Sequence, residues 1–351
     1  MPYAFALTGK ARIGNEVLDF LSGKFGSEPG IFTTEPTKGS EPSFGDLMRW
    51  YQHSVFLMGA AQLGRWDVAS PIATANVVAQ IRQVDQGSPG SDIGGIGHGN
   101  FLLLTPSAMC GLYLFHRGAI MEALQLTRFV LMLWRSDKSA FHMLYDIATG
   151  EVVTESSAQH HRWLQGKNVL HVVHPSKERQ HSFASGLAIA LLAEAFAATK
   201  DRDLLVAAGE IVQFDLRCAW EGPFKRWPSK CKVAWGAANL LRFGNFGDEA
   251  LLSSARLRTH IQEVTKCCFL DNQHPLGHFG DYHFPISDRC VSELPSGTIH
   301  WEEGSCGLIV AEDYVTGEEE ELCAEFVYEL MIVSRALGRN FESQRKKRDR
   351  S

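Results

Sequence analysis

The sequence lacks the patterns that mark nucleic-acid-binding, membrane-spanning and secreted proteins. It has no long basic stripe, and its formal net charge of -6 argues against binding to a phosphate backbone, which depends on clustered Lys and Arg. No stretch is long and apolar enough to span a membrane, and the N-terminus lacks the basic start and apolar core of a secretory signal. We therefore expect a cytoplasmic protein that binds neither nucleic acid nor membrane.

The sequence also lacks the common motifs of cofactor, metal and nucleophile sites. Its eight cysteines show no CxxC spacing and are expected to be reduced, mainly buried thiols. There is no HExxH pair and no GxSxG elbow. The glycine-rich segment GSDIGGIGHG, residues 90–99, follows an expected helix rather than a strand, so it predicts a flexible loop and not a phosphate loop. We therefore expect no cofactor and no metal.

What the sequence does contain is a succession of helical patterns, with apolar residues at helical spacing and breaks at Gly, Pro, Asp and Asn. A first short helix is expected over 12–24. Five pairs should follow: 44–63 with 66–86, 100–116 with 119–136, 183–199 with 203–220, 231–243 with 248–270, and 302–315 with 318–338. Residues 1–340 are expected to form one domain, followed by a basic tail over 341–351.

The lengths of the connections carry information about the arrangement. Turns within pairs are short and connections between pairs are long, so the long loops should gather at one end, where function usually resides. The first helix of each pair is rich in Gly, Ala, Ser and Leu, and the second carries the charge. We therefore expect an all-α protein with first helices inside and second helices outside, or a non-circular helical stack.

Two segments carry a resemblance to a known superfamily. They are SGLAIALLAEAFAATKDRDLLVAAGEIV, residues 185–212, and KCKVAWGAANLLRFG, residues 230–244. They resemble the repeats of the (α/α) toroid enzymes, that is, the six-hairpin glycosidase-like and terpenoid-cyclase-like barrels, and the resemblance covers nearly the whole chain. It implies an (α/α) toroid whose pocket opens at the N-terminal ends of the inner helices.

Four carboxylates are candidates for acid or base catalysis at that end. Glu302 and Glu303 would begin the last inner helix, where carboxylates either cap the helix or, beside an apolar cavity, gain a raised pKa. Asp46 would begin the first inner helix. Asp146 lies in FHMLYDIATGEVVTE, which predicts a small β-hairpin insertion near 141–154, and there an Asp more often initiates the turn than catalyses.

Aromatic and polar residues at the same end are expected to bind substrate. They are Trp50, Tyr51, His53, His98, Asn100, His181, Trp227, Trp235, Asp281, His283 and Trp301. A metal site stays open as an alternative, because His278, Asp281 and His283, or His171 and His174, could converge on an ion.

Three classes of function are compatible with these residues. The favoured one is a cofactor-independent acid/base enzyme that cyclises or isomerises an apolar, prenylated or polyketide-derived molecule, because the inner helices are apolar with aromatic residues at their mouths. The resemblance alone also implies a carbohydrate enzyme: a glycoside hydrolase, an unsaturated uronide hydrolase or a sugar epimerase. The third class is a binding or scaffold protein. The expected partner is a small-molecule substrate, and a homo-oligomer is compatible with the sequence.

Overall fold

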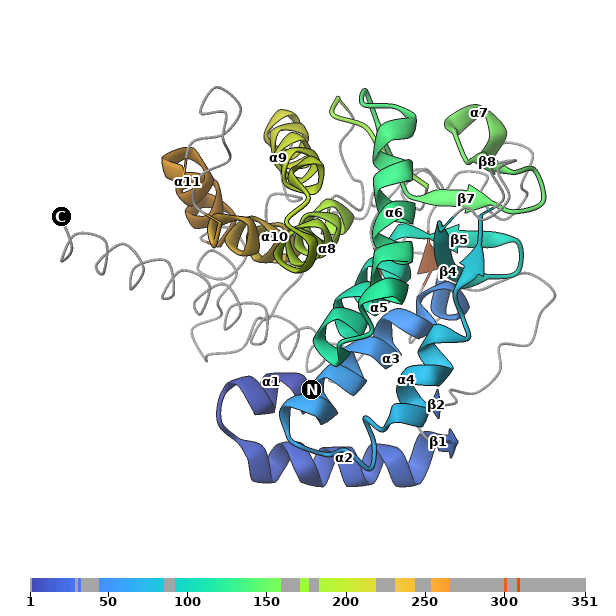
Figure 1. Ribbon diagram of the computed structural model, residues 1–351, viewed down its shortest axis with the longest axis vertical. Helices are drawn as coiled ribbons and strands as arrows, with labels where there is room; N and C mark the ends of the chain where they lie inside the picture. The colour runs from blue at the N-terminus through green and yellow to red at the C-terminus, as the bar shows by residue number, and fades with distance from the viewer. Residues whose placement is uncertain are drawn as a thin grey trace.

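The computed structural model of the protein describes residues 2–28, 31–32, 44–84, 92–158, 171–176, 183–218, 231–243, 254–265, 300–301 and 308–309 (Figure 1). Its helices are α1 (Pro2–Leu7), α2 (Ala11–Phe25), α3 (Phe44–Gln62), α4 (Pro71–Val78), α5 (Leu104–Arg117), α6 (Ile120–Ser136), α7 (Glu155–Ala158), α8 (Phe183–Thr199), α9 (Arg202–Arg217), α10 (Cys231–Leu241) and α11 (Ser254–Thr265). Its strands are β1 (Gly26–Glu28), β2 (Ile31–Phe32), β3 (Arg82–Gln83), β4 (Gly94–His98), β5 (Phe101–Leu103), β6 (Phe141–His142), β7 (Leu144–Asp146), β8 (Glu151–Val152), β9 (Val172–Val173), β10 (His300–Trp301) and β11 (Leu308–Ile309).

Most of the helices pack in consecutive pairs, as the sequence predicts. Helix α5 packs on α6, α8 on α9, and α10 on α11. The first helices also contact one another in chain order, α3 with α5, α5 with α8, and α8 with α10. The chain reverses between α5 and α6 at Gly118, whose φ of 77° lies in the left-handed region that glycine favours at a helix end. Short turns of this kind bring neighbouring helices side by side.

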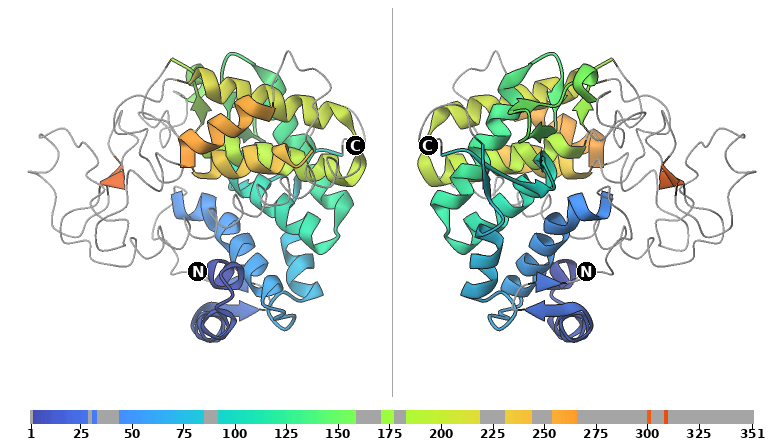
Figure 2. Two further views of the ribbon diagram at one scale, coloured as in Figure 1. Left: turned by 90° about the vertical axis from the view of Figure 1, so that its left-hand side faces the viewer. Right: turned by 90° about the vertical axis from the view of Figure 1, so that its right-hand side faces the viewer.

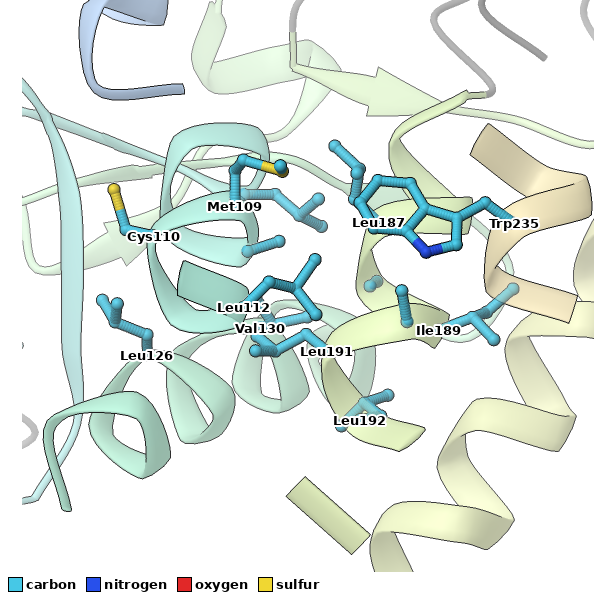
Figure 3. Close-up of a cluster of buried hydrophobic side chains, with 14 of the residues drawn as sticks. Met109, Cys110, Leu112, Leu126, Val130, Leu187, Ile189, Leu191, Leu192 and Trp235 are labelled. Carbon is cyan, nitrogen blue, oxygen red and sulfur yellow. The ribbon is translucent and has the colours of Figure 1, made fainter. Parts of the chain in front are cut away.

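The first helices are more deeply buried than the second ones. Residues 184–193 of α8 are all buried, whereas α9 keeps charged residues on its outer face and exposes Val206. Figure 3 shows the core between α5, α6, α8 and α10, with Leu187 and Leu191 of α8 among the side chains of the neighbouring helices. This difference in burial confirms the expectation that the apolar helices lie inside and the charged ones outside.

The tightest helix contact is the crossing of α8 and α10. A Cβ atom built on Gly186 would lie 2.1 Å from the carbonyl oxygen of Lys232, and one built on Gly236 would lie 2.3 Å from the carbonyl oxygen of Gly186. Each glycine therefore lets the backbone of one helix touch the backbone of the other. The small residues of these two helices allow this approach, because a larger side chain would hold the axes apart.

Polar side chains join the C-terminal ends of four helices. Gln62 of α3 contacts His116 of α5, with 3.1 Å between Nε2 and Nε2. The charge of Glu194 in α8 acts on His116, and Glu194 forms an ion pair with Arg242, which follows α10. We call Gln62, His116, Glu194 and Arg242 the polar line. It connects the C-terminal ends of α3, α5, α8 and α10.

The expectation of an all-α (α/α) toroid is wrong, because the structure contains an antiparallel sheet of five strands. The strand order is β3-β4-β5-β7-β8, and β4 contacts both α5 and α6 (Figure 1). The sheet includes residues 94–98 of the segment 90–99, which the sequence predicted to be a flexible loop. Gly97 is needed there, since a Cβ atom would lie 1.9 Å from the carbonyl oxygen of Phe101 on the paired strand.

The predicted hairpin near 141–154 is confirmed, but it belongs to this sheet rather than standing alone. Strand β7 pairs with β8 across a turn in which Gly150 has a φ of 72°, and β7 also pairs with β5. Residues 141–142, expected in the same hairpin, instead form β6 and pair with β9. The hairpin is therefore an edge of a larger sheet.

Two expected helices are several residues shorter in the structure, and the segment expected to form a third contains a strand. The helix expected over 100–116 begins at Leu104, after strand β5, and the one expected over 66–86 is shortened to α4 by strand β3 at its end. Residues 308–309, inside the helix expected over 302–315, form β11 and pair with β10. The helix expected over 318–338 and the basic tail, residues 341–351, lie outside the described residues.

The N-terminal helices extend the structure at one end. Helix α1 packs on α3, and α2 packs on α1, so that both lie at the lower end in Figure 2, away from α8 and α9. None of the helices within the described ranges has the length and apolarity needed to cross a membrane. The expected single domain over 1–340 stays a prediction.

Candidate functional site

The N-terminal parts of α3, α8 and α10 meet around a buried lysine. Lys232, near the start of α10, is only 3% exposed. Its Nζ atom lies 5.1 Å from the ring centroid of Phe183, which begins α8, and 5.8 Å from the ring centroid of Tyr51 in α3. An ammonium group at such distances is attracted by the ring faces, more strongly when little water competes. We call Lys232, Tyr51 and Phe183 the lysine–aromatic cluster.

Trp50 extends this cluster along α3. Trp50 and Tyr51 are each 9% exposed. The ring centroid of Trp50 lies 4.9 Å from that of His53, at an interplanar angle of 42°. The carbonyl oxygen of Trp50 lies 3.5 Å from Sγ of Cys110 in α5, which donates to it. The first half of α3 is thereby fixed to α5 on one side and faces the cluster on another.

His53 has both ring nitrogens engaged. Its Nε2 atom accepts a hydrogen bond from the backbone N–H of Phe32 at 2.9 Å, and its Nδ1 atom donates to the carbonyl oxygen of Arg49 at 2.8 Å. Burial lowers the pKa of His53 below its usual value and outweighs the backbone hydrogen bonds, which act in the opposite direction; the nearby charge of Arg49 also lowers the pKa. Both ring nitrogens of this neutral imidazole are thus bonded within the protein, and its role in binding a substrate stays a prediction.

Cys110 is an inert thiol. It accepts a hydrogen bond from Oγ of Ser54, with 3.0 Å between oxygen and sulfur, and both side chains are fully buried. Burial raises the pKa of the Cys110 thiol to about 12, so the nucleophilic thiolate is not formed at neutral pH. This thiol therefore contributes packing between α3 and α5, as its sequence context predicts.

The chain matches no family model, no curated protein and no solved structure. The resemblance to the six-hairpin superfamily stays a prediction, and the roles of the site residues must be argued from their positions.

Two of the predicted binding residues lie at the sheet instead of at a helix start. His98 and Asn100 flank Gly99 in the turn between β4 and β5, and both are exposed. Arg82 of β3 donates to the carbonyl oxygens of Gly99 and Phe101 and so holds this turn. The expectation that His98 and Asn100 lie at the mouth of an inner helix is therefore wrong, because strand β5 separates them from α5.

Asp146 has the geometry of a turn-initiating residue. Its Oδ1 atom accepts a hydrogen bond from the backbone N–H of Ala148 at 2.8 Å, and its carbonyl oxygen accepts from the N–H of Gly150 at 2.9 Å. The side chain is buried, at 3% exposure. These bonds account for an Asp at this position without a catalytic role. Its catalytic role stays a prediction.

Trp235 lies in the core of the helical region. It is buried on α10, and its ring faces Leu187 of α8 (Figure 3). Asp46 lies near the start of α3, and Trp301 lies on β10. The remaining predicted residues lie outside the described residues: Glu302, Glu303, His181, Trp227, Asp281 and His283. The structure therefore brings Trp50, Tyr51 and His53 together, whereas the predicted acids Glu302 and Glu303 lie outside the described residues.

Lys232 and Phe183 are site residues that the sequence motifs did not predict. Lys232 is the only charged residue in the helix CKVAWGAANLL, and a lone charge in an apolar helix is a signal that could have identified it. In the described part of the chain, no three His, Cys, Asp or Glu side chains gather as a metal site. The alternative site at His278, Asp281 and His283 lies outside that part.

Proposed function

We propose that this protein is an enzyme that cyclises or isomerises an apolar small molecule at the lysine–aromatic cluster. The observation that carries the proposal is the buried ammonium group of Lys232 beside the rings of Tyr51 and Phe183. Aromatic rings give an apolar molecule a large contact area. A fixed positive charge in a site of low dielectric stabilises negative charge that develops on a substrate oxygen during proton transfer.

The predicted acid and base belong to the proposal as sequence predictions. Glu302, Glu303, Asp146 and Asp46 are the carboxylates predicted from the sequence, and proton transfer between them and the substrate would need no cofactor. We further propose a cytoplasmic location and a small-molecule partner, without nucleic acid or membrane, for a monomer or homo-oligomer.

A comparison of two lysines tests this function. Lys24 of α2 also lies over two rings, 5.4 Å from Phe20 and 5.1 Å from Phe25, but it is exposed and far along the chain from the cluster. Purified wild-type protein, Lys232→Met and the control Lys24→Met would be incubated with prenylated phenols, polyketide-derived phenols and unsaturated uronides. Products would be identified by chromatography with mass spectrometry.

We expect turnover of an apolar substrate by the wild-type protein and by Lys24→Met. Lys232→Met should lose about 100-fold or more in kcat/KM, the effect of removing one charge-stabilising group. The free energy of unfolding of Lys232→Met would be measured beside its turnover, because removing one member of a buried charged contact can destabilise a fold and must be separated from a loss of catalysis. Turnover of the uronides, or full activity of Lys232→Met on an apolar substrate, would refute the proposal.

A further inference from the structure

A single imidazole holds the β1–β2 pair against α3. Strand β1 pairs with β2, and β2 contacts α3 through Phe32. The backbone N–H of Phe32 donates to Nε2 of His53, and the two ring centroids lie 5.5 Å apart. The Phe32 ring also packs edge-on against Phe56, with 4.2 Å between centroids. The attachment thus combines one hydrogen bond with a short row of rings.

The hydrogen bonds of His53 determine which nitrogen carries the proton. A backbone N–H can only donate, so Nε2 must accept and be unprotonated. A carbonyl oxygen can only accept, so Nδ1 must carry the hydrogen that it donates to Arg49. A second proton would have to bind at Nε2. Protonation of Nε2 would replace the acceptor atom by an N–H group that points at the N–H of Phe32, and two donors cannot form a hydrogen bond.

The surroundings of His53 favour the neutral ring. The side chain is 5% exposed, and burial lowers its pKa. Arg49, on the same helix, is the charged group that acts on it among the described residues, and its positive charge also opposes protonation. The groups that pack against the ring from β2 and α3, Phe32 and Trp50, are uncharged. No described carboxylate compensates a charged imidazole there.

We propose that His53 is a proton-operated latch that holds the β1–β2 pair closed on α3 when neutral and releases it when protonated. The proton comes from solvent and binds at Nε2. The hydrogen bond to Phe32 is then lost, and the charged ring leaves its place between Phe32 and Trp50. The latch is independent of the proposed function.

The effect of the latch on activity rests on the proposed function. Trp50 packs on His53 and is followed directly by Tyr51 of the lysine–aromatic cluster. Release of the β1–β2 pair would therefore remove one support of Trp50, the residue next to Tyr51 of the cluster. Acidification should then change substrate binding at this site before it unfolds the protein.

Hydrogen exchange followed by mass spectrometry tests the latch without a ligand. Exchange of peptides that contain β1 and β2 would be measured at about pH 7.5 and about pH 4 and corrected for intrinsic rates; the lower pH lies below the usual range of a histidine because the pKa of His53 is lowered. Wild-type protein should exchange about tenfold faster in these peptides at the lower pH, the factor expected from losing one hydrogen bond. Peptides from α8 should not change.

Two variants separate His53 from other titrating groups. His53→Phe keeps a ring but has no acceptor, so its β1–β2 peptides should exchange fast at both pH values. His53→Gln is a smaller change in polarity and replaces the first variant if that variant fails to fold. The exchange of its β1–β2 peptides should also be independent of pH. His116→Gln is the matched control. His116 also has a pKa lowered by burial, but it lies in the last turn of α5, so the exchange of the β1–β2 peptides in this variant should match that in the wild-type protein.

Equal exchange of the wild-type peptides at both pH values would overturn the latch, and so would a pH dependence retained in His53→Phe. An active enzyme whose pH profile is the same in wild type and His53→Gln would overturn the regulation of the site while leaving the proposed function intact. An inactive protein that still shows the pH-dependent exchange would support the latch and count against the proposed function alone.

Discussion

The contact of α8 with α10 leads to a sharp prediction, that Gly186→Ala destabilises the protein although alanine is the better helix former. The new Cβ atom would lie 2.1 Å from the carbonyl oxygen of Lys232 and 2.4 Å from the backbone nitrogen of Val233. Cβ contacts below 3.0 Å essentially do not occur, so the two backbones must separate by about 0.9 Å, that is, 3.0 Å less 2.1 Å. Neither clashing atom belongs to a flexible side chain.

The magnitude follows from two opposing effects. Alanine gains about 1 kcal/mol over glycine in a helix interior. Overpacking a close contact costs about 1–3 kcal/mol, and the upper end applies where backbone must move and apolar contacts along a whole helix are loosened. We therefore expect Gly186→Ala to lower the free energy of unfolding by about 2 kcal/mol. The same shift would move Lys232 away from Phe183, so activity should fall as well.

Gly209→Ala is the matched control. Gly209 also lies inside a helix, α9, but a Cβ atom there would have nothing within 4 Å. This variant should gain up to about 1 kcal/mol from helix propensity alone. The assay is urea unfolding followed by circular dichroism. A Gly186→Ala protein that unfolds at the same or a higher urea concentration than wild type would refute the close approach of the two helices.

Two further predictions concern buried polar groups. Burial lowers the pKa of His260 from 6.5 to about 4. As the pH falls, the unfolded chain therefore binds the proton first, and the free energy of unfolding that is present above pH 6.5 decreases towards pH 4 by about 3 kcal/mol in all. His260→Leu should lose correspondingly less of its free energy of unfolding between pH 6.5 and pH 4, as measured by urea unfolding at a series of pH values. The same dependence of stability on pH in this variant and in wild type would contradict the lowered pKa of His260. Asp146→Ala removes the acceptor for the N–H of Ala148 and should lose at least about 1 kcal/mol, whereas Asp146→Asn keeps that acceptor and should lose less. Loss of turnover in Asp146→Asn, with stability retained, would instead show that the carboxylate is catalytic.

The helical part of the fold could be predicted because its signals are local. The helix expected over 183–199 matches α8 in full, and the one expected over 12–24 differs from α2 by one residue at each end. Apolar spacing and the residues at the turns are enough to place such helices.

Two prolines in the sequence indicate where helices α4 and α5 begin. Pro71 lies inside the helix expected over 66–86, but proline is tolerated only in the first turn. Ser70 is the N-cap of α4, accepting from the N–H of Ala73 at 3.1 Å, so the helix begins at Pro71. Pro106 likewise lies in the first turn of α5, which excludes the helix expected from residue 100.

Strands β3, β4 and β5 of the sheet could not be predicted because they have few residues and little local signal. Strand β4 is GGIGH, a composition typical of loops, and its glycines are selected by close contacts with β3, β5 and α6. A Cβ atom on Gly95 would lie 3.1 Å from the ring of Phe129 in α6. Such contacts join residues that are far apart in the chain, so tertiary packing, and not local preference, makes this segment a strand.

The polar line has a consequence for the order of folding. Gln62 and His116 are 54 positions apart in the sequence, and Glu194 and Arg242 are 48 apart. Contacts between such distant positions form only after the intervening helices have docked, because the cost of closing the chain must first be recovered by local packing. The polar line should therefore form after the transition state, and its interactions should slow unfolding without speeding folding.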